Sequence, residues 1–498
     1  MSTGRGLPPA RATAFNRHDR KREACMIGDA KRGWRDRKHR PVIGQRGLWA
    51  AATLVVLLPH AATSFPVDGD QAVLPAGSEL NEDALDVPRE VLHSEYRGDR
   101  TSYLVALGDL AFNSPAILGD VARRANISCG TCHVNGASNA KLFVPGMSTR
   151  PGNFDTTGPL FNPKADNHVL DPVRIPSLRG ARYLAPYGHD GRMASLRDFV
   201  RNVVINEFAG PEPSAAILDA IVAYIQDIDF LPNPKLGARG RLNESASETE
   251  RRGEALFSKP FPRDPNLSCA GCHLPAGAFV DHLQHDVGSG GLFKTPTLLN
   301  ANFNAPYFHD GRYDDLGQVV DHFDRVFGLA LSAQDRGDLV AYLRAVGDGR
   351  QPYDRDSVMV RFKEISTFSL LLAQAIGMRD REAIELAVDT LGGELRDLTE
   401  RFPDHRNPAV TGALVERRLA RAALKDVVIS LRRIAIAVTT GDFDAATAEY
   451  RTYYDLTFSR AMPLLRGTEP WSLFNPALRE AHDAQRRQML RTPAQAQR

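Results

Sequence analysis

The chain has 498 residues, with 62 lysines and arginines against 60 aspartates and glutamates, and therefore a formal net charge of +2. Hydrophobic residues make up 43% and charged residues 24%, which is typical of a soluble globular protein and excludes a disordered chain, a collagen-like fibre and a polytopic membrane protein. Five cysteines are too few for a disulfide scaffold. At about 150 residues per domain, the length predicts about three domains.

The first 64 residues have the order of a secretory signal. A basic stretch, residues 1–46, precedes the apolar run 48–58, and small residues follow at 61–64. The basic stretch alone would suggest nucleic-acid binding, but the apolar run that follows it favours export instead. That run is too short to span a bilayer as a helix, although an uncleaved anchor is the alternative. We therefore predict a leader and signal peptide at 1–64, a linker at 65–86, a periplasmic protein without an integral membrane domain after cleavage, and no nucleic-acid partner.

The next feature is a pair of CxxCH motifs, CGTCH at 129–133 and CAGCH at 269–273. This motif is typical of c-type haem attachment, in which two thiols add to the haem vinyl groups and the histidine ligates the iron. A redox CxxC pair or one four-cysteine zinc site is the alternative, but each pair is followed directly by histidine. The motifs predict two covalently bound c-type haems with six attachment and ligand residues: Cys129, Cys132, His133, Cys269, Cys272 and His273.

A second motif repeats after each CxxCH, namely APYxHDGR at 185–192 and 305–312, with the histidines His189 and His309. A helical apolar pattern follows each copy. We therefore predict two repeated domains, 87–237 and 245–350, within a mainly α fold. The distance from CxxCH to HDGR is 20 residues longer in the first repeat, and the extra residues fall in a Gly-, Asn- and Pro-rich loop at 134–171. Long loops of this kind are often functional.

Residues 355–498 contain no cysteine and are rich in Ala, Leu, Arg and Glu. Their apolar periodicity predicts a bundle of four or five helices of unassigned role. The predicted helices are Val358–Gly377, Glu382–Arg401, Val410–Val438 and Phe443–Leu465.

Together with RGEALF at 252–257 and FKTPTLLN at 293–300, the CxxCH and HDGR motifs resemble the bacterial di-haem cytochrome c peroxidase/MauG family over about 87–350. The resemblance implies two cytochrome-c-like domains. The first haem would react with hydrogen peroxide, and the second would receive electrons from a small donor, a cytochrome c or a copper protein. It also implies a calcium ion between the domains, near Asn304 and Pro306.

The resemblance further implies a distal glutamate above the first haem, and Glu207 in the stretch VVINEFAG matches it with a two-residue gap in register. Such an acid takes a proton from one peroxide oxygen and delivers it to the other. The family's glutamine on the same helix is replaced by Phe199. His168 and Met147, both in the long loop, are candidates for a ligand that blocks this haem.

At the second haem the family places a methionine or tyrosine ligand where this chain has Phe323. The adjacent His322 is the predicted iron ligand, and a helix-surface histidine beside a five-coordinate haem is the alternative. The family's tryptophan between the haems is replaced by His189, with His309 at the same place in the second repeat. An imidazole there can bridge haem propionates by hydrogen bonds, so we expect electrons to pass between the haems.

The leading interpretation is an exported di-haem enzyme that reduces hydrogen peroxide to water. One alternative is a MauG-like oxidase acting on a protein or organic substrate. Another is a non-catalytic electron carrier or redox sensor.

Overall fold

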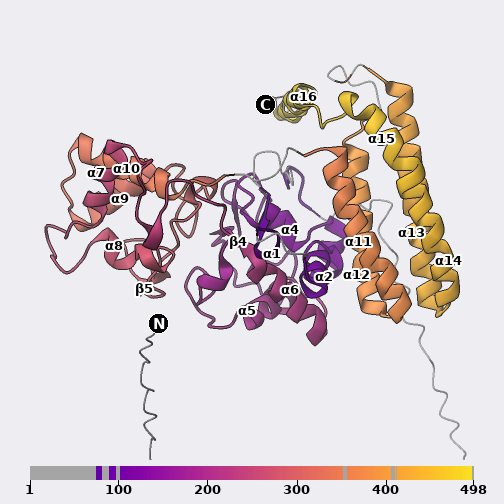
Figure 1. Cartoon of the computed structure of the whole chain (residues 1–498), viewed down its shortest axis with the longest axis horizontal. Coiled ribbons are helices and arrows are strands. Elements are labelled where there is room, and N and C mark those ends of the chain that lie inside the picture. Colours follow the sequence, from indigo (N-terminus) through magenta and orange to yellow (C-terminus); the bar gives the residue numbers. More distant parts are fainter. Residues whose placement is uncertain are drawn as a thin grey trace, which may run out of the picture. The chain divides into compact units, whose positions relative to one another are not determined.

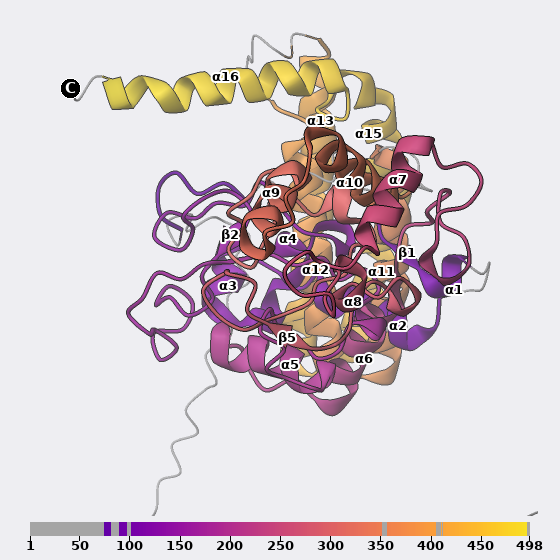
Figure 2. The same ribbon diagram turned by 90° about the vertical axis from the view of Figure 1, so that its left-hand side faces the viewer.

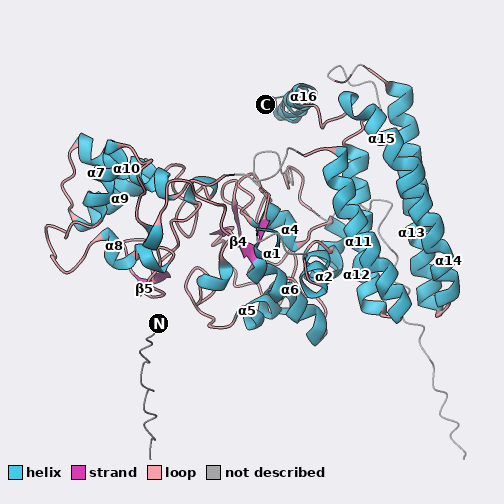
Figure 3. Cartoon of the chain, in the orientation of Figure 1, coloured by secondary structure: helices cyan, strands magenta, loops and turns pink. Residues whose placement is uncertain are grey.

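The protein was analysed as a computed structural model, which describes residues 74–80, 89–96, 101–350, 356–404, 410 and 412–495. The predicted leader and signal peptide, and most of the predicted linker, lie outside these residues. The described part is mostly helical, as predicted, and each named strand has only two residues (Figure 3). Within it no single helix is long and apolar enough to cross a membrane, and one pair of segments, 103–112 with 115–125, passes the same test jointly with a bend of 63°.

The first repeat is built around two packed helices, α2 and α6. Its helices are α1 His93–Tyr96, α2 Tyr103–Phe112, α3 Gly119–Ala125, α4 Cys129–Cys132, α5 Leu196–Asn202 and α6 Ala215–Asp227. A π-helix, η5 Val203–Glu207, follows α5. Two antiparallel strand pairs join β1 Val91–Leu92 to β4 Ile228–Asp229 and β2 Asn153–Phe154 to β3 Val173–Arg174.

The second repeat has the corresponding pair, α7 against α10. Its helices are α7 Glu248–Phe257, α8 Cys269–Cys272, α9 Leu316–Phe327 and α10 Ala333–Val346, which gather in one group in Figure 1. The strand β5 Gln284–His285 pairs with β6 Phe293–Lys294. Short 3-10 turns across the chain are η2 Pro115–Leu118, η3 Val134–Gly136, η4 Ala181–Tyr183, η6 Ala238–Gly240, η7 Pro275–Gly277, η8 Ala301–Phe303 and η10 Glu469–Trp471.

A matched glycine brings the two helices together in each repeat. A Cβ on Gly108 would lie 2.0 Å from the carbonyl oxygen of Ala220, and a Cβ on Gly253 would lie 2.0 Å from that of Asp338. Only glycine permits this approach, because any side chain would overlap the facing backbone. The same helices also carry matched aromatic pairs, at 5.2 Å in the first repeat and 4.9 Å in the second. The pairs are Phe112 with Tyr224 and Phe257 with Tyr342.

The remaining helices are α11 Val358–Met378, α12 Arg381–Glu400, α13 Leu414–Thr440, α14 Phe443–Asp455, α15 Met462–Thr468 and α16 Pro476–Gln495, with a π-helix, η9 Leu456–Ala461, before α15. Helix α11 packs on α12 and α14, and α13 packs on α12 and α14. Figure 2 shows α16 side-on as one straight helix.

The third and fourth predicted helices differ from the observed ones at identifiable places. Helix α13 begins at Leu414 rather than at Val410, because Ala413 at its start has a left-handed backbone. The predicted helix 443–465 is interrupted by the π-helix η9, directly before Pro463. Proline has no amide hydrogen and its ring clashes with the preceding turn, so a regular α-helix cannot run through it.

Helix α12 is tied to the first repeat by buried polar contacts. The Thr390 hydroxyl donates to the carbonyl of Leu110 at 2.9 Å. The guanidinium of Arg123, which is only 8% exposed, pairs with Asp389 at 2.9 Å. Arg123 also pairs with Glu385 of α12 at 3.3 Å, so two acids of this helix share one buried cation of the first repeat.

Candidate functional site

The first CxxCH motif forms a single helical turn that begins at Ser128. The Ser128 amide donates to the Thr131 hydroxyl at 3.0 Å, which is half of a capping box. The histidine that follows, His133, has its Nδ1 at 2.9 Å from the carbonyl of Pro176. Burial lowers the pKa of His133 to about 4, so the ring is neutral. A neutral ring that donates from Nδ1 keeps the Nε2 lone pair for a metal.

The second motif repeats this arrangement around His273. Its Nδ1 lies 3.2 Å from the carbonyl of Phe279, and burial lowers the pKa of the ring. The phenylalanine at the end of the preceding helix lies 6.3 Å from this ring, and the corresponding distance in the first repeat is 6.4 Å. The two histidines therefore have matched surroundings, and each is prepared as a neutral nitrogen ligand.

The cysteines do not meet in a shared metal site. Burial raises the pKa of Cys129 and of Cys269 to about 12, so both thiols are protonated. Among the described residues, the only cluster of three or more potential metal ligands within 4.8 Å of one another contains a single cysteine. The arrangement therefore disfavours the four-cysteine zinc alternative.

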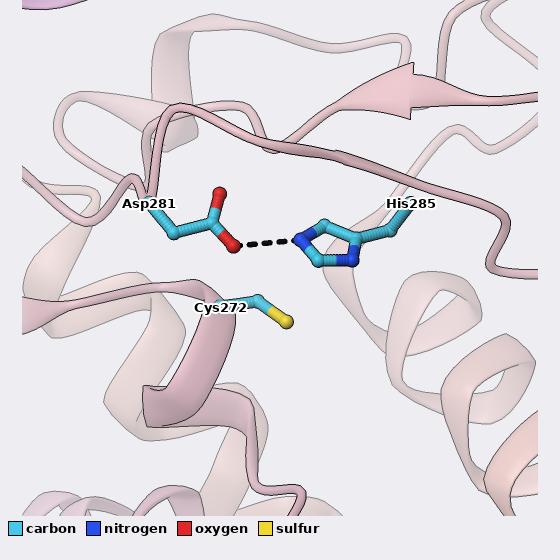
Figure 4. A group of neighbouring side chains, drawn as sticks. All are labelled: Cys272, Asp281 and His285. Atoms are coloured by element: carbon cyan, nitrogen blue, oxygen red, sulfur yellow. Dashed lines mark hydrogen bonds and ion pairs between the residues drawn. The ribbon is translucent and has the colours of Figure 1, made fainter.

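That cluster consists of Cys272, Asp281 and His285 (Figure 4). The carboxylate of Asp281 accepts a hydrogen bond from Nε2 of His285 at 2.6 Å, and the Cys272 sulfur lies beside this pair. Burial, followed by the nearby Asp281 charge, raises the pKa of the Cys272 thiol. The same sulfur cannot serve both a metal triad and a haem.

Glu207 lies at the end of the π-helix η5, with a side chain only 12% exposed. Its Oε1 accepts hydrogen bonds from Arg192 at 3.3 Å and from Asn202 at 3.2 Å. Burial raises the pKa of Glu207 despite the opposing effect of the Arg192 charge. A π-helix contains one extra residue per turn and is frequent at functional sites. The two-residue gap between Glu207 and the family's glutamate was the sign of this π-helix in the sequence. The sequence did not predict that Arg192 and Asn202 would contact Glu207.

The long loop of the first repeat folds over this acid. The Asn162 amide donates to the carbonyl of Asn206 at 2.5 Å, and the Phe161 and Phe208 rings lie 4.9 Å apart. His168, suggested as a blocking ligand, has a side chain 86% exposed and contacts Asp166. The alternative, Met147, is 3% exposed. The loop thus packs on the Glu207 turn while His168 faces solvent.

His189 and His309 lie where the two repeats touch. Nε2 of His189 lies 2.6 Å from the carbonyl of Arg174, and burial with the Arg174 charge lowers the pKa of His189 to about 3. His309 stacks on Phe293 with ring centroids 3.7 Å apart, and burial lowers its pKa as well. Both rings are therefore neutral and can donate or accept hydrogen bonds at this junction.

His322 is 5% exposed, which differs from the surface position considered as its alternative. Its Nδ1 lies 2.9 Å from the Tyr313 hydroxyl, and its Nε2 lies 2.7 Å from the carbonyl of Val287. Phe308 packs edge-on against the ring at 4.6 Å. Ligation of iron by His322 requires one of its two ring nitrogens to give up its present partner.

Residues 247–385 match the family model described as di-haem cytochrome c peroxidase. Over these residues the chain is similar to this family. The match begins in the second repeat and runs 35 residues past 350, where the resemblance was expected to end, so it includes α11 and the start of α12. The family is one of oxidoreductases that carry haem.

Curated relatives are similar over about half of the chain. Hydrazine synthase subunit gamma of Kuenenia stuttgartiensis is 25% identical over 53% of this chain and 83% of its own length. The methylamine utilization protein MauG of Methylorubrum extorquens is 24% identical over 49% of this chain and 77% of its own. The cytochrome c peroxidase Ccp of Escherichia coli is 25% identical over 51% of this chain and 60% of its own.

Proposed function

We propose that the chain is a periplasmic di-haem peroxidase that reduces hydrogen peroxide to water with electrons from a small cytochrome c or copper protein. The observation that carries this proposal is Glu207, a buried carboxyl with a raised pKa that only the first repeat possesses. Residues 87–237 would form the peroxide-reacting domain, and residues 245–350 the electron-transfer domain. Residues 355–498 would form a helical bundle that packs on the first repeat.

Two covalently attached haems would be held by the CxxCH thiols, with His133 and His273 as the proximal ligands. When bound, haem supplies the redox-active iron at which peroxide and electrons are exchanged. The residues present fit this group, since each motif offers two cysteines outside any disulfide and a neutral imidazole whose Nδ1 is already engaged. His189 and His309 would hydrogen-bond the propionates at the junction of the repeats.

The role of Glu207 follows from its protonation chemistry. Its carboxylate takes a proton from one oxygen of hydrogen peroxide and returns it to the other oxygen, which leaves as water. With two electrons and two further protons, one peroxide gives two waters. Hydrogen bonds from Arg192 and Asn202 hold Oε1 of the Glu207 carboxyl group. Because the two carboxyl oxygens are bonded to the same carbon, these contacts also set the direction of Oε2. The Phe161 and Phe208 rings pack beside the turn and restrict access of water.

The test is stopped-flow mixing of peroxide with Glu207→Gln in the oxidised and half-reduced protein. We expect both haems to remain attached and peroxide-dependent oxidation to slow by a factor of about 100, the size of lost general acid–base catalysis. Glu212→Gln is the matched control, because Glu212 is an exposed glutamate paired with Arg201. Single-turnover kinetics of Glu207→Gln equal to those of the control would remove Glu207 from the mechanism.

The MauG-like alternative predicts that a protein or organic substrate is oxidised instead of a small cytochrome. Similarity to MauG is of the same order as similarity to Ccp, so identity alone does not separate the two. Steady-state turnover with a reduced small cytochrome supports the peroxidase. Peroxide consumption that requires a protein or organic substrate instead, with no oxidation of the cytochrome, would favour the oxidase.

A further inference from the structure

The two repeats exchange a matched pair of contacts through one basic residue each, Arg174 in β3 and Lys294 in β6. The Arg174 amide donates to the carbonyl of His309 at 2.6 Å. The Lys294 amide donates to the carbonyl of His189 at 2.8 Å. Each basic residue stands two positions before the proline of PSL or PTL. The backbone of each repeat therefore holds the HDGR histidine of the other repeat.

The side chains of Arg174 and Lys294 also form hydrogen bonds to the other repeat. Nζ of Lys294 donates to the carbonyls of Leu184 and Pro186 at 2.7 and 2.6 Å. Nη1 of Arg174 donates to the carbonyl of Asn304 at 3.4 Å. Leu184 and Asn304 occupy the same place in the two repeats, five residues before the HDGR histidine. Each repeat thus presents backbone carbonyls that receive a cationic side chain from the other.

The carbonyls around Asn304 and Pro306 are also the place where the resemblance implied a calcium ion. Calcium requires six to eight oxygen ligands, usually with carboxylates among them. Here a guanidinium already contacts the carbonyl of Asn304, and within residues 101–350 no carboxylate forms a hydrogen bond or ion pair with Arg174 or Lys294. A divalent cation beside a buried guanidinium is strongly repelled at low dielectric. The Arg174 guanidinium therefore disfavours calcium at this carbonyl, and the buried side-chain oxygen Oδ1 of Asn304, which has no hydrogen-bond partner among the described residues, is the one further ligand that Asn304 offers.

We propose that the Arg174 guanidinium takes the place of the expected calcium ion at the carbonyl of Asn304, and that Lys294, at the matching carbonyls of the first repeat, is the principal positioning residue of the His189 loop. Lys294 contributes three hydrogen bonds to residues 184–189, two from its ammonium and one from its amide. His282, from the same repeat as Lys294, adds a contact from its Nδ1 to the carbonyl of Ala185 at 2.6 Å. Burial of Lys294 is strong enough to lower its pKa to about 8, in keeping with an enclosed position.

The cost of losing Lys294 follows from what its removal leaves behind. The carbonyls of Leu184 and Pro186 would lose their donor at a half-buried position, and unsatisfied buried carbonyls are unfavourable. Glutamine at this position is too short to reach both carbonyls, and methionine offers no donor. The loop that carries His189 would then open more often, while the second repeat would keep its own core.

The experiment uses the full protein with both haems attached and compares Lys294→Met with Lys259→Met, an exposed lysine of the same repeat. Hydrogen–deuterium exchange of amides 184–193 is expected to be at least about tenfold faster in Lys294→Met than in the control, with exchange of α7 and α10 unchanged. Equal exchange in the two variants would overturn the positioning role. Hydrogen–deuterium exchange does not depend on peroxide turnover, so a negative result here would contradict the role of Lys294 without contradicting the proposed peroxidase function.

The calcium part of the proposal is tested on the unmodified protein, so it does not depend on a variant that folds. Thermal unfolding is recorded with excess calcium chloride and with a chelator. We expect the same midpoint within about 1 °C in both, and no heat of calcium binding by calorimetry. A chelator-induced fall of the midpoint by several degrees, or a stoichiometric calcium-binding isotherm, would overturn it.

Discussion

The two CxxCH repeats share a frame and differ at one turn. In both, a glycine allows two helices to touch, and a buried neutral histidine follows the second cysteine. Eighteen residues after the HDGR histidine, however, the first repeat has Glu207 in a π-helix, whereas the second has Phe327 in a regular α-helix. One fold therefore carries a protonatable group in one copy and an aromatic group in the other, so chemistry is set by local substitution on a common scaffold.

The residues around Glu207 are more polar than those around Phe327. In the first repeat Arg192 reaches Glu207, and the long loop covers the turn. In the second repeat the equivalent arginine, Arg312, donates to the carbonyl of Ser289 at 3.1 Å instead. Phe327 stacks on Phe323 with an interplanar angle of 4°. The second repeat thus has an aromatic ring at the position where the first has a carboxyl group suited to proton transfer.

Replacing the glycine at the helix contact should destabilise the protein to a similar extent in both repeats, and this is the largest effect we expect. Gly108→Ala and Gly253→Ala each place a methyl group 2.0 Å from a facing carbonyl oxygen, so the helices must separate. Each change should destabilise the protein by about 3 kcal/mol or more, at the upper end of overpacking costs. Denaturant unfolding measures this. Gly377→Ala, at a glycine with open space around its Cβ position, is the control. A large loss for one repeat alone would break the symmetry.

The second comparison concerns the sixth position of the second haem. We expect a low-spin signal in the electron paramagnetic resonance spectrum of the oxidised protein to disappear in His322→Ala if His322 ligates the iron. Tyr313→Phe removes only the hydroxyl that contacts Nδ1, so it should retain the signal with a small shift. Persistence of the low-spin signal in His322→Ala would show that another group binds there, or that the signal comes from the first haem alone.

The smallest expected effect sharpens the role of Arg192 beside Glu207. The Arg192 charge lowers the Glu207 pKa and burial raises it, with burial the larger influence. Proton uptake from peroxide needs the carboxylate, so the peroxide rate should rise with pH through a Glu207 pKa that lies above the usual value. Arg192→Gln should raise that pKa further and move the acid limb to higher pH, which slows the reaction severalfold at mildly acidic pH. Stopped-flow rates between pH 4 and 8 measure this.

The corresponding change in the second repeat provides the control. Arg312→Gln leaves Glu207 and its partners untouched, since Arg312 pairs with Asp310 and contacts Ser289. Its pH profile should match that of the unmodified protein. An acid limb that is unchanged in Arg192→Gln, or shifted equally in both variants, would exclude the Arg192–Glu207 contact from peroxide chemistry.

The sequence by itself determined the features that depend on local pattern. The periodicity of 358–377 and 382–401 predicted α11 and α12 to within one residue at each end, because long amphipathic helices are specified by spacing and by caps such as Ser357 and Asp380. The two CxxCH motifs and the HDGR repeat also indicated the family whose model matches residues 247–385, since the residues of each motif are consecutive and their spacing reflects their chemistry.

Only the tertiary structure decided how distant segments meet. The donors to Glu207 come from the HDGR loop and the preceding helix, and the packing of the long loop on the Glu207 turn joins residues 44 positions apart. Lys294 reaches carbonyls more than 100 residues away, at a junction that no periodicity describes. Burial, which neutralises the histidines and raises the Glu207 pKa, is a property of the packed molecule, because it depends on which side chains exclude water around each group.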